Sequence, residues 1–194
     1  MYATAKIGLV FVPLNPAYTP QQTISALTHV QASCLIIGSF RQPMNGDPRS
    51  TKPVVEAVQK ARNDSQRHDI KGNFLSHIII DHNADDCARA SPQIDLIDYR
   101  GLLERYQGCR PEPVPLDCHD VINIQFTSGT TSTPKAVCLS HHNLMNNGKI
   151  TAGIMELDEN DVMCCPPPQF HVFGIVLGLL TALAYGKYPA SCTT

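Results

Sequence analysis

Residues 121–135 read VINIQFTSGTTSTPK, an apolar segment followed directly by a polar, hydroxyl-rich one. Its first six residues, Val121 to Phe126, are mostly apolar and include β-branched and aromatic side chains, which predicts a strand. The next nine, Thr127 to Lys135, combine many hydroxyl side chains with one glycine and one lysine. Such a loop can surround a phosphate, because hydroxyl and backbone N–H groups donate to phosphate oxygens and lysine adds positive charge. A plain polar surface loop is the alternative that this composition leaves open.

The loop does not follow the common nucleotide-binding pattern Gly-x-x-x-x-Gly-Lys-Ser/Thr. Counted from Gly129, that pattern needs a glycine and a hydroxyl side chain where this chain has Pro134 and Ala136. Pro134 lacks the N–H that would bind a phosphate, and Ala136 has no hydroxyl to hold Mg²⁺. The sequence therefore disfavours a kinase or GTPase of that type.

The segments before the loop alternate between strand and helix signals. Thr19 and Pro20 are typical of a helix start, which predicts a helix from Pro20 to about Val30 between strands at 7–13 and 34–38. Further along, the patterns predict a helix at 53–62, a strand at 78–80, a surface loop at 83–92, a helix at 96–106 and a proline-rich connector near 107–119. Together they indicate βαβ units with parallel strands.

The segments after the loop continue the alternation. Ser140 is a helix-capping residue and predicts a helix behind the short apolar segment 136–139. A strand near 162–165 and an apolar helix after His171 follow. The whole chain thus predicts an α/β fold of mostly parallel strands with helical crossovers.

Composition excludes several classes of protein. With 43% hydrophobic and 16% charged residues among 194, and a net charge of -2, neither a disordered chain nor a nucleic-acid-binding protein is indicated. The longest apolar run, 173–185, is shorter than the roughly 20 residues that cross a bilayer, so we expect a buried helix and no transmembrane segment. The eight cysteines form no Cys-x-x-Cys pair, and Cys118 directly precedes His119, so we expect free thiols in a reducing compartment and no metal site.

Three segments resemble, in order, signature segments of the adenylate-forming (AMP-binding) superfamily. Residues 126–141 are similar to aromatic-T-S-G-T-T-G-x-P-K-G-V followed by an aliphatic residue, S/T and H. Residues 5–20 are similar to an early segment of these enzymes, and residues 166–174 to their Pro-x-x-His-x-x-Gly segment. The string from 122 to 147 most resembles medium-chain acyl-CoA synthetases, including fungal acyl-CoA ligases of secondary metabolism.

The resemblance implies a reaction and a set of site residues. ATP and a carboxylic acid form an acyl-adenylate with loss of pyrophosphate, and the acyl group then passes to the thiol of coenzyme A; the cofactors implied are ATP, Mg²⁺ and coenzyme A. His171 is implied to lie between the carboxylate pocket and the pantetheine channel, whereas patterning alone favours a core or capping histidine. The residues implied to bind the β- and γ-phosphates are Thr127, Ser128, Gly129, Thr130, Thr131, Ser132, Thr133, Pro134 and Lys135.

The chain departs from the superfamily pattern at two loop glycines, replaced by Ser132 and Ala136. If position 132 needs a positive φ, serine costs about 1 kcal/mol or more there. Ala136 adds only a methyl group, and we expect it to be tolerated. His141 and His142 are assigned no role, and the acidic residues at 158–161 are interpreted as a turn.

Complete members of the superfamily are much longer than this chain. We therefore expect residues 1–194 to form a partial N-terminal domain, with the C-terminal domain and its adenylation lysine absent and adenylation very weak or lacking. The alternative is a non-catalytic ATP-binding pseudoenzyme or interaction module that associates with an intact paralogue. A cytoplasmic location is expected, and the peroxisomal and mitochondrial locations of complete relatives stay open.

Overall fold

The computed structural model describes residues 1–38, 52–67, 74–81, 96–127 and 134–184. The chain divides into two compact units, one built from Met1–Pro16 and Pro111–Thr194 and the other from Ala17–Arg110. No helix within the described ranges is long and apolar enough to span a membrane.

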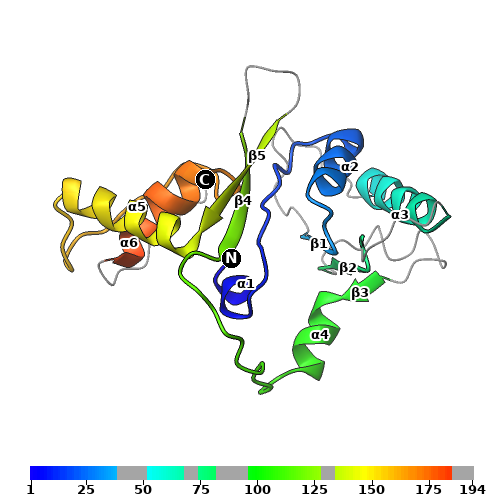
Figure 1. Cartoon of the computed structure of the whole chain (residues 1–194), viewed down its shortest axis with the longest axis horizontal. Coiled ribbons are helices and arrows are strands. Elements are labelled where there is room, and N and C mark those ends of the chain that lie inside the picture. Colours follow the sequence, from blue (N-terminus) through cyan, green and yellow to red (C-terminus); the bar gives the residue numbers. More distant parts are fainter. Residues whose placement is uncertain (39–51, 68–73, 82–95, 128–133, 185–194) are drawn as a thin grey trace. The chain divides into compact units, whose positions relative to one another are not determined.

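A parallel three-stranded sheet forms the centre of the Ala17–Arg110 unit (Figure 1). Its strands lie in the order β1 (Cys34–Ile37), β2 (His77–Ile80) and β3 (Leu96–Asp98). Cys34 pairs with His77, and Ile78 pairs with Leu96. Helix α3 (Lys52–Arg67) joins β1 to β2 as the crossover that a parallel pair requires. The predicted parallel strands with a helical crossover are confirmed here.

Helix α2 (Pro20–His29) begins at the predicted cap and packs against α3. The Thr19 hydroxyl accepts the Gln22 N–H at 3.3 Å, and the Gln22 side chain accepts the Thr19 N–H at 2.9 Å. This reciprocal pair is a capping box, which satisfies two N–H groups at the helix start. The buried hydrophobic core of the unit takes residues from α2, α3 and β2 and from the turn before β2: Ala26, Leu27, Val55, Val58, Leu75, Ile78 and Ile80.

The predicted strand at 7–13 is wrong. Helix α1 (Tyr2–Lys6) occupies the start of the chain, and Gly8 follows it with φ of +72°. Only Phe11 makes a β-bridge: its N–H donates to Ile122 O at 2.9 Å, and its carbonyl accepts from Ile124 at 3.0 Å. Pro13 has no N–H to extend this ladder, so the bridge does not grow into a strand. The first predicted βαβ unit therefore lacks its first strand.

Two other sequence-based elements need correction. The predicted helix at 96–106 divides into β3 and α4 (Tyr99–Arg105), because Asp98 acts as a cap: its carboxylate accepts N–H bonds from Arg100 at 3.1 Å and Gly101 at 2.9 Å. The predicted strand near 162–165 is only a single-residue bridge at Cys164. Three prolines, 166–168, follow Cys165 and have no N–H groups for a ladder. The loop predicted at 83–92 lies outside the described residues.

The other unit is built on an antiparallel hairpin and the helices that pack beside it (Figure 1). Strands β4 (Val121–Thr127) and β5 (Lys135–Ser140) pair, with a register shift between Val121 and Asn123. Helix α5 (His141–Ile154) follows β5 directly and packs against both η1 (Phe173–Leu180), a π-helix, and α6 (Thr181–Ala184). Six buried residues form the core of this unit: Ala5, Ile122, Leu144, Ile175, Val176 and Leu180.

The π-helix η1 confirms the predicted apolar helix after His171, in a wider form. The Thr181 hydroxyl donates to Val176 O at 2.9 Å, five residues back. Two glycines let other segments approach the helix backbone. A Cβ added at Gly174 would overlap Pro168 O, and one added at Gly178 would overlap the Sγ of Cys165. An eight-residue π-helix is unusual, because π-helical geometry occurs mostly as single-turn bulges, frequently at functional sites.

Candidate functional site

The predicted phosphate loop joins the two strands of the β4–β5 hairpin. Thr127 ends β4, Lys135 begins β5, and the two residues form the last cross-strand pair. The strand before the loop and the helix after it are both confirmed. Of the nine predicted phosphate-binding residues, the structure describes three, Thr127, Pro134 and Lys135; the roles predicted for residues 128–133 stay predictions because those residues lie outside the described ranges.

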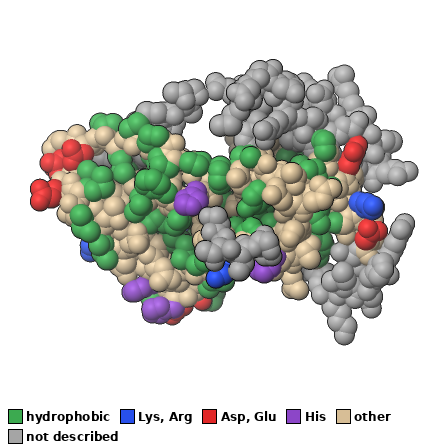
Figure 2. Space-filling model, turned by 90° about the horizontal axis from the view of Figure 1, so that it is seen from above, with side chains coloured by type: hydrophobic (Ala, Val, Ile, Leu, Met, Phe, Trp, Pro, Cys, Tyr) green, Lys and Arg blue, Asp and Glu red, His purple; other side chains and the backbone are tan. Residues whose placement is uncertain are grey.

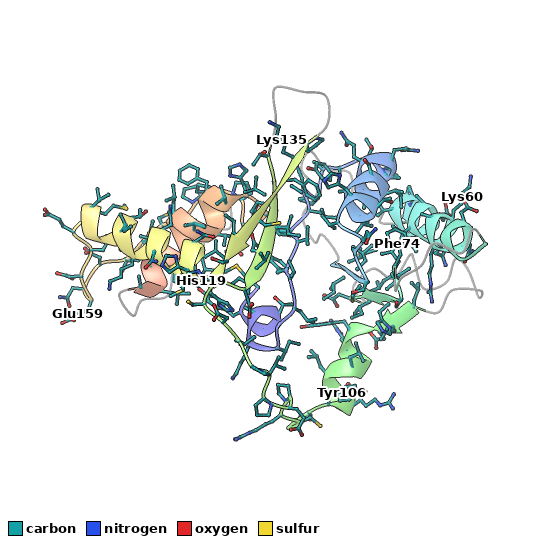
Figure 3. The ribbon with its side chains drawn as sticks, in the orientation of Figure 1. Lys60, Phe74, Tyr106, His119, Lys135 and Glu159 are labelled. Carbon is teal, nitrogen blue, oxygen red and sulfur yellow. The ribbon has the colours of Figure 1, made fainter. Side chains whose placement is uncertain are left out.

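The described end of the hairpin is polar and carries an unpaired positive charge. The Thr127 hydroxyl lies 3.5 Å from Lys135 O, a long hydrogen bond. Lys135 is exposed, and within the part of the chain that the structure describes no acidic side chain pairs with it. Figure 3 shows its side chain at the end of the hairpin. A lysine without a carboxylate partner is available to a phosphate, so these residues fit the ligand that the sequence predicts.

A capping box fixes the other end of β5. Ser140 Oγ accepts the Asn143 N–H at 3.2 Å, and Asn143 Oδ1 accepts the Ser140 N–H at 3.1 Å. The helix start predicted at Ser140 is confirmed by this pair. Because β5 runs without interruption from Lys135 to Ser140, the hairpin and α5 form one continuous support for the loop.

His171 lies at the start of η1 and is exposed. Its N–H donates to Pro168 O at 3.1 Å, and its Nδ1 accepts the Phe173 N–H at 3.2 Å. An accepting Nδ1 favours the neutral tautomer that carries its proton on Nε2. This position suits a histidine that caps a helix as well as one that faces a ligand, so the substrate-binding role implied for His171 stays a prediction.

A pocket of about 520 Å³ lies between β5, α5 and the start of η1. Residues from β5 and η1 supply most of its apolar wall, and two asparagines of α5 add amide groups. The lining consists of Cys138, Leu139, Asn143, Leu144, Asn147, Val172, Phe173, Val176 and Leu177. The volume lies within the range of small-molecule sites, and the mixture of many apolar groups with few polar ones is typical of them.

The pocket is lined by residues next to both predicted site segments, the phosphate loop and His171, within one unit. Cys138 and Leu139 belong to the strand that begins at Lys135, whereas Val172 and Phe173 directly follow His171. Sequence reasoning did not predict this lining. The available signal was the helical spacing of Phe173, Val176 and Leu177 behind the histidine, which reads equally well as ordinary core.

The acidic residues at 158–161 form the turn that the sequence predicts. Asp158 N–H donates to an Asp161 carboxylate oxygen at 2.8 Å, and Asn160 N–H donates to Asp158 Oδ1 at 2.6 Å. Figure 3 shows the neighbouring Glu159 beyond the end of α5. The carboxylates of Asp158 and Asp161 therefore accept hydrogen bonds from the backbone of the turn.

Comparisons with known proteins agree with the sequence signatures. Residues 1–188 match the family described as AMP-binding enzyme. Acyl-CoA ligase sidI of Aspergillus fumigatus is 33% identical over 186 residues, covering 96% of this chain and 30% of that protein. The mitochondrial medium-chain acyl-CoA ligase ACSF2 of Homo sapiens is 32% identical over 190 residues, covering 95% of this chain and 30% of that protein. The chain thus spans 30% of the length of each of these relatives.

Solved structures share the fold at lower sequence identity. The anthranilate CoA ligase AuaEII in complex with anthranoyl-AMP gives a TM-score of 0.69 at 19% identity, covering 97% of this chain and 31% of that one. ATP-bound MatB from Rhodopseudomonas palustris gives a TM-score of 0.61 at 21% identity, covering 95% of this chain and 30% of that one. The inhibitor-bound N-terminal domain of FACL13 from Mycobacterium tuberculosis gives a TM-score of 0.63 at 22% identity, covering 98% of this chain and 39% of that one.

These likenesses confirm the predicted fold class, an α/β architecture that matches the N-terminal domains of adenylate-forming enzymes. Since the family match covers residues 1–188 and both relatives are more than 30% identical, the chain belongs to the AMP-binding enzyme family and is related to acyl-CoA ligases.

Proposed function

We propose that this chain provides the ATP-phosphate-binding and acid-binding parts of an acyl-CoA ligase. In the proposed reaction a carboxylate oxygen attacks the α-phosphorus of ATP, pyrophosphate leaves, and the thiol of coenzyme A then attacks the acyl carbonyl as AMP leaves. The observation that carries the proposal is the exposed Lys135 at the end of a hairpin whose second strand also lines an apolar pocket.

The phosphate-binding role rests on the charge and position of Lys135. Its ammonium group is a point charge that can pair with phosphate oxygens, and Thr127 beside it offers a hydroxyl. When bound, Mg²⁺ neutralises part of the phosphate charge. The solved relative MatB, which was determined with ATP bound, supports a nucleotide at this fold.

The acid-binding role rests on the pocket beside η1. Its wall of Leu139, Phe173 and Val176 suits an aliphatic or aromatic acyl group, because burying apolar surface contributes roughly 25 cal/mol per Å². The names of the relatives support this class of substrate: ACSF2 is a medium-chain acyl-CoA ligase, and AuaEII was solved with anthranoyl-AMP. We propose a medium-chain carboxylic acid as the first substrate to test.

We further propose that the polypeptide of these 194 residues adenylates acids very weakly by itself. Catalysis by positioning needs the nucleotide, the carboxylate and the catalytic groups held together, and the chain spans 30% of its relatives. The second candidate function is a non-catalytic ATP-binding module that acts with an intact paralogue, and the exposed Lys135 fits it equally, because holding a phosphate needs no turnover.

The test is to measure ATP binding and acid-dependent pyrophosphate release on the purified chain with octanoate. Lys135→Ala is compared with Lys149→Ala, which removes another exposed lysine of the same unit. ATP binding that depends on Lys135 supports the phosphate-binding role, and robust octanoate-dependent pyrophosphate release would refute weak adenylation. Binding of ATP with no acid-dependent release favours the module. No ATP binding by the wild type would contradict the proposal as a whole.

A further inference from the structure

Three consecutive residues before β4 bring metal-ligating atoms together. The carboxylate of Asp117, the thiol of Cys118 and the imidazole of His119 all lie within 4.8 Å of one another, and all three residues are exposed. The adjacency of Cys118 and His119 argued against a metal site in the sequence, because one loop usually spaces its ligands by several residues. In the structure, a further side chain that can ligate a metal comes from another segment, so the site does not depend on the spacing within this loop.

That donor is His142, in the first turn of α5. The ring centroids of His119 and His142 lie 5.2 Å apart, with an angle of 32° between the ring planes. Two imidazoles on one tetrahedral zinc ion, each with a Zn–N bond of 2.0–2.1 Å, have centroids separated by about 5 Å. The separation of the two ring centroids is therefore close to that of two imidazoles that share one ion, and a rotation of the exposed His142 side chain would bring its nitrogen to the other three ligand atoms.

Backbone hydrogen bonds hold the two segments together. His142 N–H donates to Cys118 O at 2.8 Å, and His141 N–H donates to Asp120 O at 3.3 Å. Within the loop, His119 N–H donates to Asp117 Oδ1 at 2.7 Å, and Asp117 N–H donates to Asp120 Oδ2 at 2.8 Å. These bonds fix the main chain and leave the second carboxylate oxygen of Asp117, the thiol and both imidazoles for a ligand.

The donor set determines which ion fits. One thiolate, two imidazoles and one carboxylate oxygen are ligands of zinc, whereas Mg²⁺ and Ca²⁺ take oxygen ligands. Ligand atoms around tetrahedral zinc lie about 3.5 Å apart, so the three atoms now within 4.8 Å need only small side-chain rotations. Because these three side chains are exposed, little packing opposes such rotations.

We propose that Asp117, Cys118, His119 and His142 form a zinc-binding site. It is separate from the predicted phosphate loop: β4 begins at Val121, paired with Ser140, whereas the loop follows the Thr127–Lys135 pair. Val121 and Thr127 are six residue steps apart along β4, which corresponds to about 20 Å. Figure 3 shows His119 and Lys135 toward opposite ends of the hairpin. Bound zinc links the segment before β4 to the start of α5.

The experiment titrates the metal-free chain with Co²⁺, which reports tetrahedral thiolate coordination by its absorption spectrum, and then with Zn²⁺ in competition. We expect one equivalent of Co²⁺ with a thiolate charge-transfer band, displaced by Zn²⁺. Cys118→Ser abolishes that band, and Cys118→Ser and His142→Gln each lower Zn²⁺ affinity by more than about tenfold. Cys109→Ser, which removes another exposed cysteine, is the matched control and leaves both unchanged.

A second measurement serves if a variant fails to fold. The wild-type chain is labelled with N-ethylmaleimide with and without one equivalent of Zn²⁺, and each cysteine is quantified by mass spectrometry. Zn²⁺ protects Cys118 and leaves Cys109 reactive if the site exists. Equal labelling of Cys118 with and without Zn²⁺ overturns the proposal, as does a Co²⁺ thiolate band that survives in Cys118→Ser or a Zn²⁺ affinity that His142→Gln leaves unchanged.

Discussion

Thr127 and Lys135 face each other as the last cross-strand pair of the β4–β5 hairpin, with the Thr127 hydroxyl 3.5 Å from the Lys135 carbonyl oxygen. The pairing brings the first and last residues of the predicted phosphate loop to the same place. A nine-residue signature is therefore closed at its base by two strands, and the charge of Lys135 is held beside the hydroxyl of Thr127.

Replacement of Lys135 tests the use of this charge. Because a charged hydrogen bond contributes about 1.5–3 kcal/mol, Lys135→Ala should weaken ATP binding by about tenfold or more, and Lys135→Arg should weaken it less. Isothermal titration calorimetry measures the affinity. Lys149→Ala is the control, and since both lysines are exposed, the unfolding midpoint should not change. Equal ATP affinities of the two alanine variants would show that Lys135 does not contact the nucleotide.

The close packing of η1 gives a prediction about stability. A Cβ at Gly178 would overlap the Sγ of Cys165, so Gly178→Ala should lower the free energy of unfolding by about 1–3 kcal/mol. Gly153 in α5 has no atom near the position of an added Cβ, and Gly153→Ala should raise the free energy of unfolding by about 0.5–1 kcal/mol. Urea denaturation compares the two variants.

The double variant Gly178→Ala/Cys165→Ala separates this contact from other effects. It removes the Sγ that the new methyl group meets, so it should recover part of the lost stability. If the double variant is less stable than Gly178→Ala by the full cost of losing the Cys165 side chain, the predicted overlap is absent.

Local sequence signals predicted those parts of the fold that depend on neighbouring residues. Thr19 and Pro20 begin α2, and Ser140 begins α5, because a cap acts within one helical turn. Asp98 offered the same kind of signal. Leu96 and Ile97 before it were read as the start of a helix, although a capping aspartate there places them in the preceding strand.

Features that depend on distant residues were not predictable in the same way. The apolar run at 7–13 reads as a strand, but its partner is β4, and only Phe11 pairs there. The pocket wall and the approach of His142 to Cys118 depend on how segments pack, which no local pattern records. The phosphate-binding signature could be recognised from the sequence because its residues are consecutive. The types of those residues indicate the chemistry without any knowledge of how distant segments pack.

The surface of α5 predicts self-association. Ile150 and Ile154 are one turn apart and are 61% and 78% exposed, and Figure 2 shows hydrophobic side chains at the surface around this helix. Exposed apolar patches favour association, so the chain should form larger species as its concentration rises. Ile150→Lys/Ile154→Lys should reduce this with little change in stability, as measured by sedimentation velocity. A wild-type chain that stays monomeric at every concentration would contradict the prediction.

The thiol of Cys34 provides a prediction about pH. Partial desolvation raises its pKa above the ordinary value of 9.0, although the residue is exposed, so the folded state holds its proton to higher pH than the unfolded state. The stability from this shift is present below the ordinary pKa and is lost as pH rises through the raised one. Iodoacetamide labelling of Cys34 should therefore rise at higher pH in the folded chain than in urea. If the pH midpoint of Cys34 labelling is lower in the folded chain than in urea, folding lowers the pKa of this thiol and the prediction is wrong.

Gln125 gives the last prediction, because no described residue accepts a hydrogen bond from its buried side-chain amide. The residue is 4% exposed, and its Nε2 has no hydrogen-bond partner within the described part of the chain, whereas Asn123 on the same face of β4 donates from Nδ2 to Phe11 O at 3.0 Å. An unsatisfied buried donor costs about 1–3 kcal/mol, so Gln125→Met should raise the free energy of unfolding by about 1 kcal/mol. Gln125→Glu should lower it by more than that, since it buries a charge, and the loss should shrink at low pH as the carboxyl is protonated. Thermal and urea unfolding of both variants measure these changes. If Gln125→Met lowers the free energy of unfolding, the Gln125 amide makes a hydrogen bond that stabilises the fold by more than the removal of a buried polar group does.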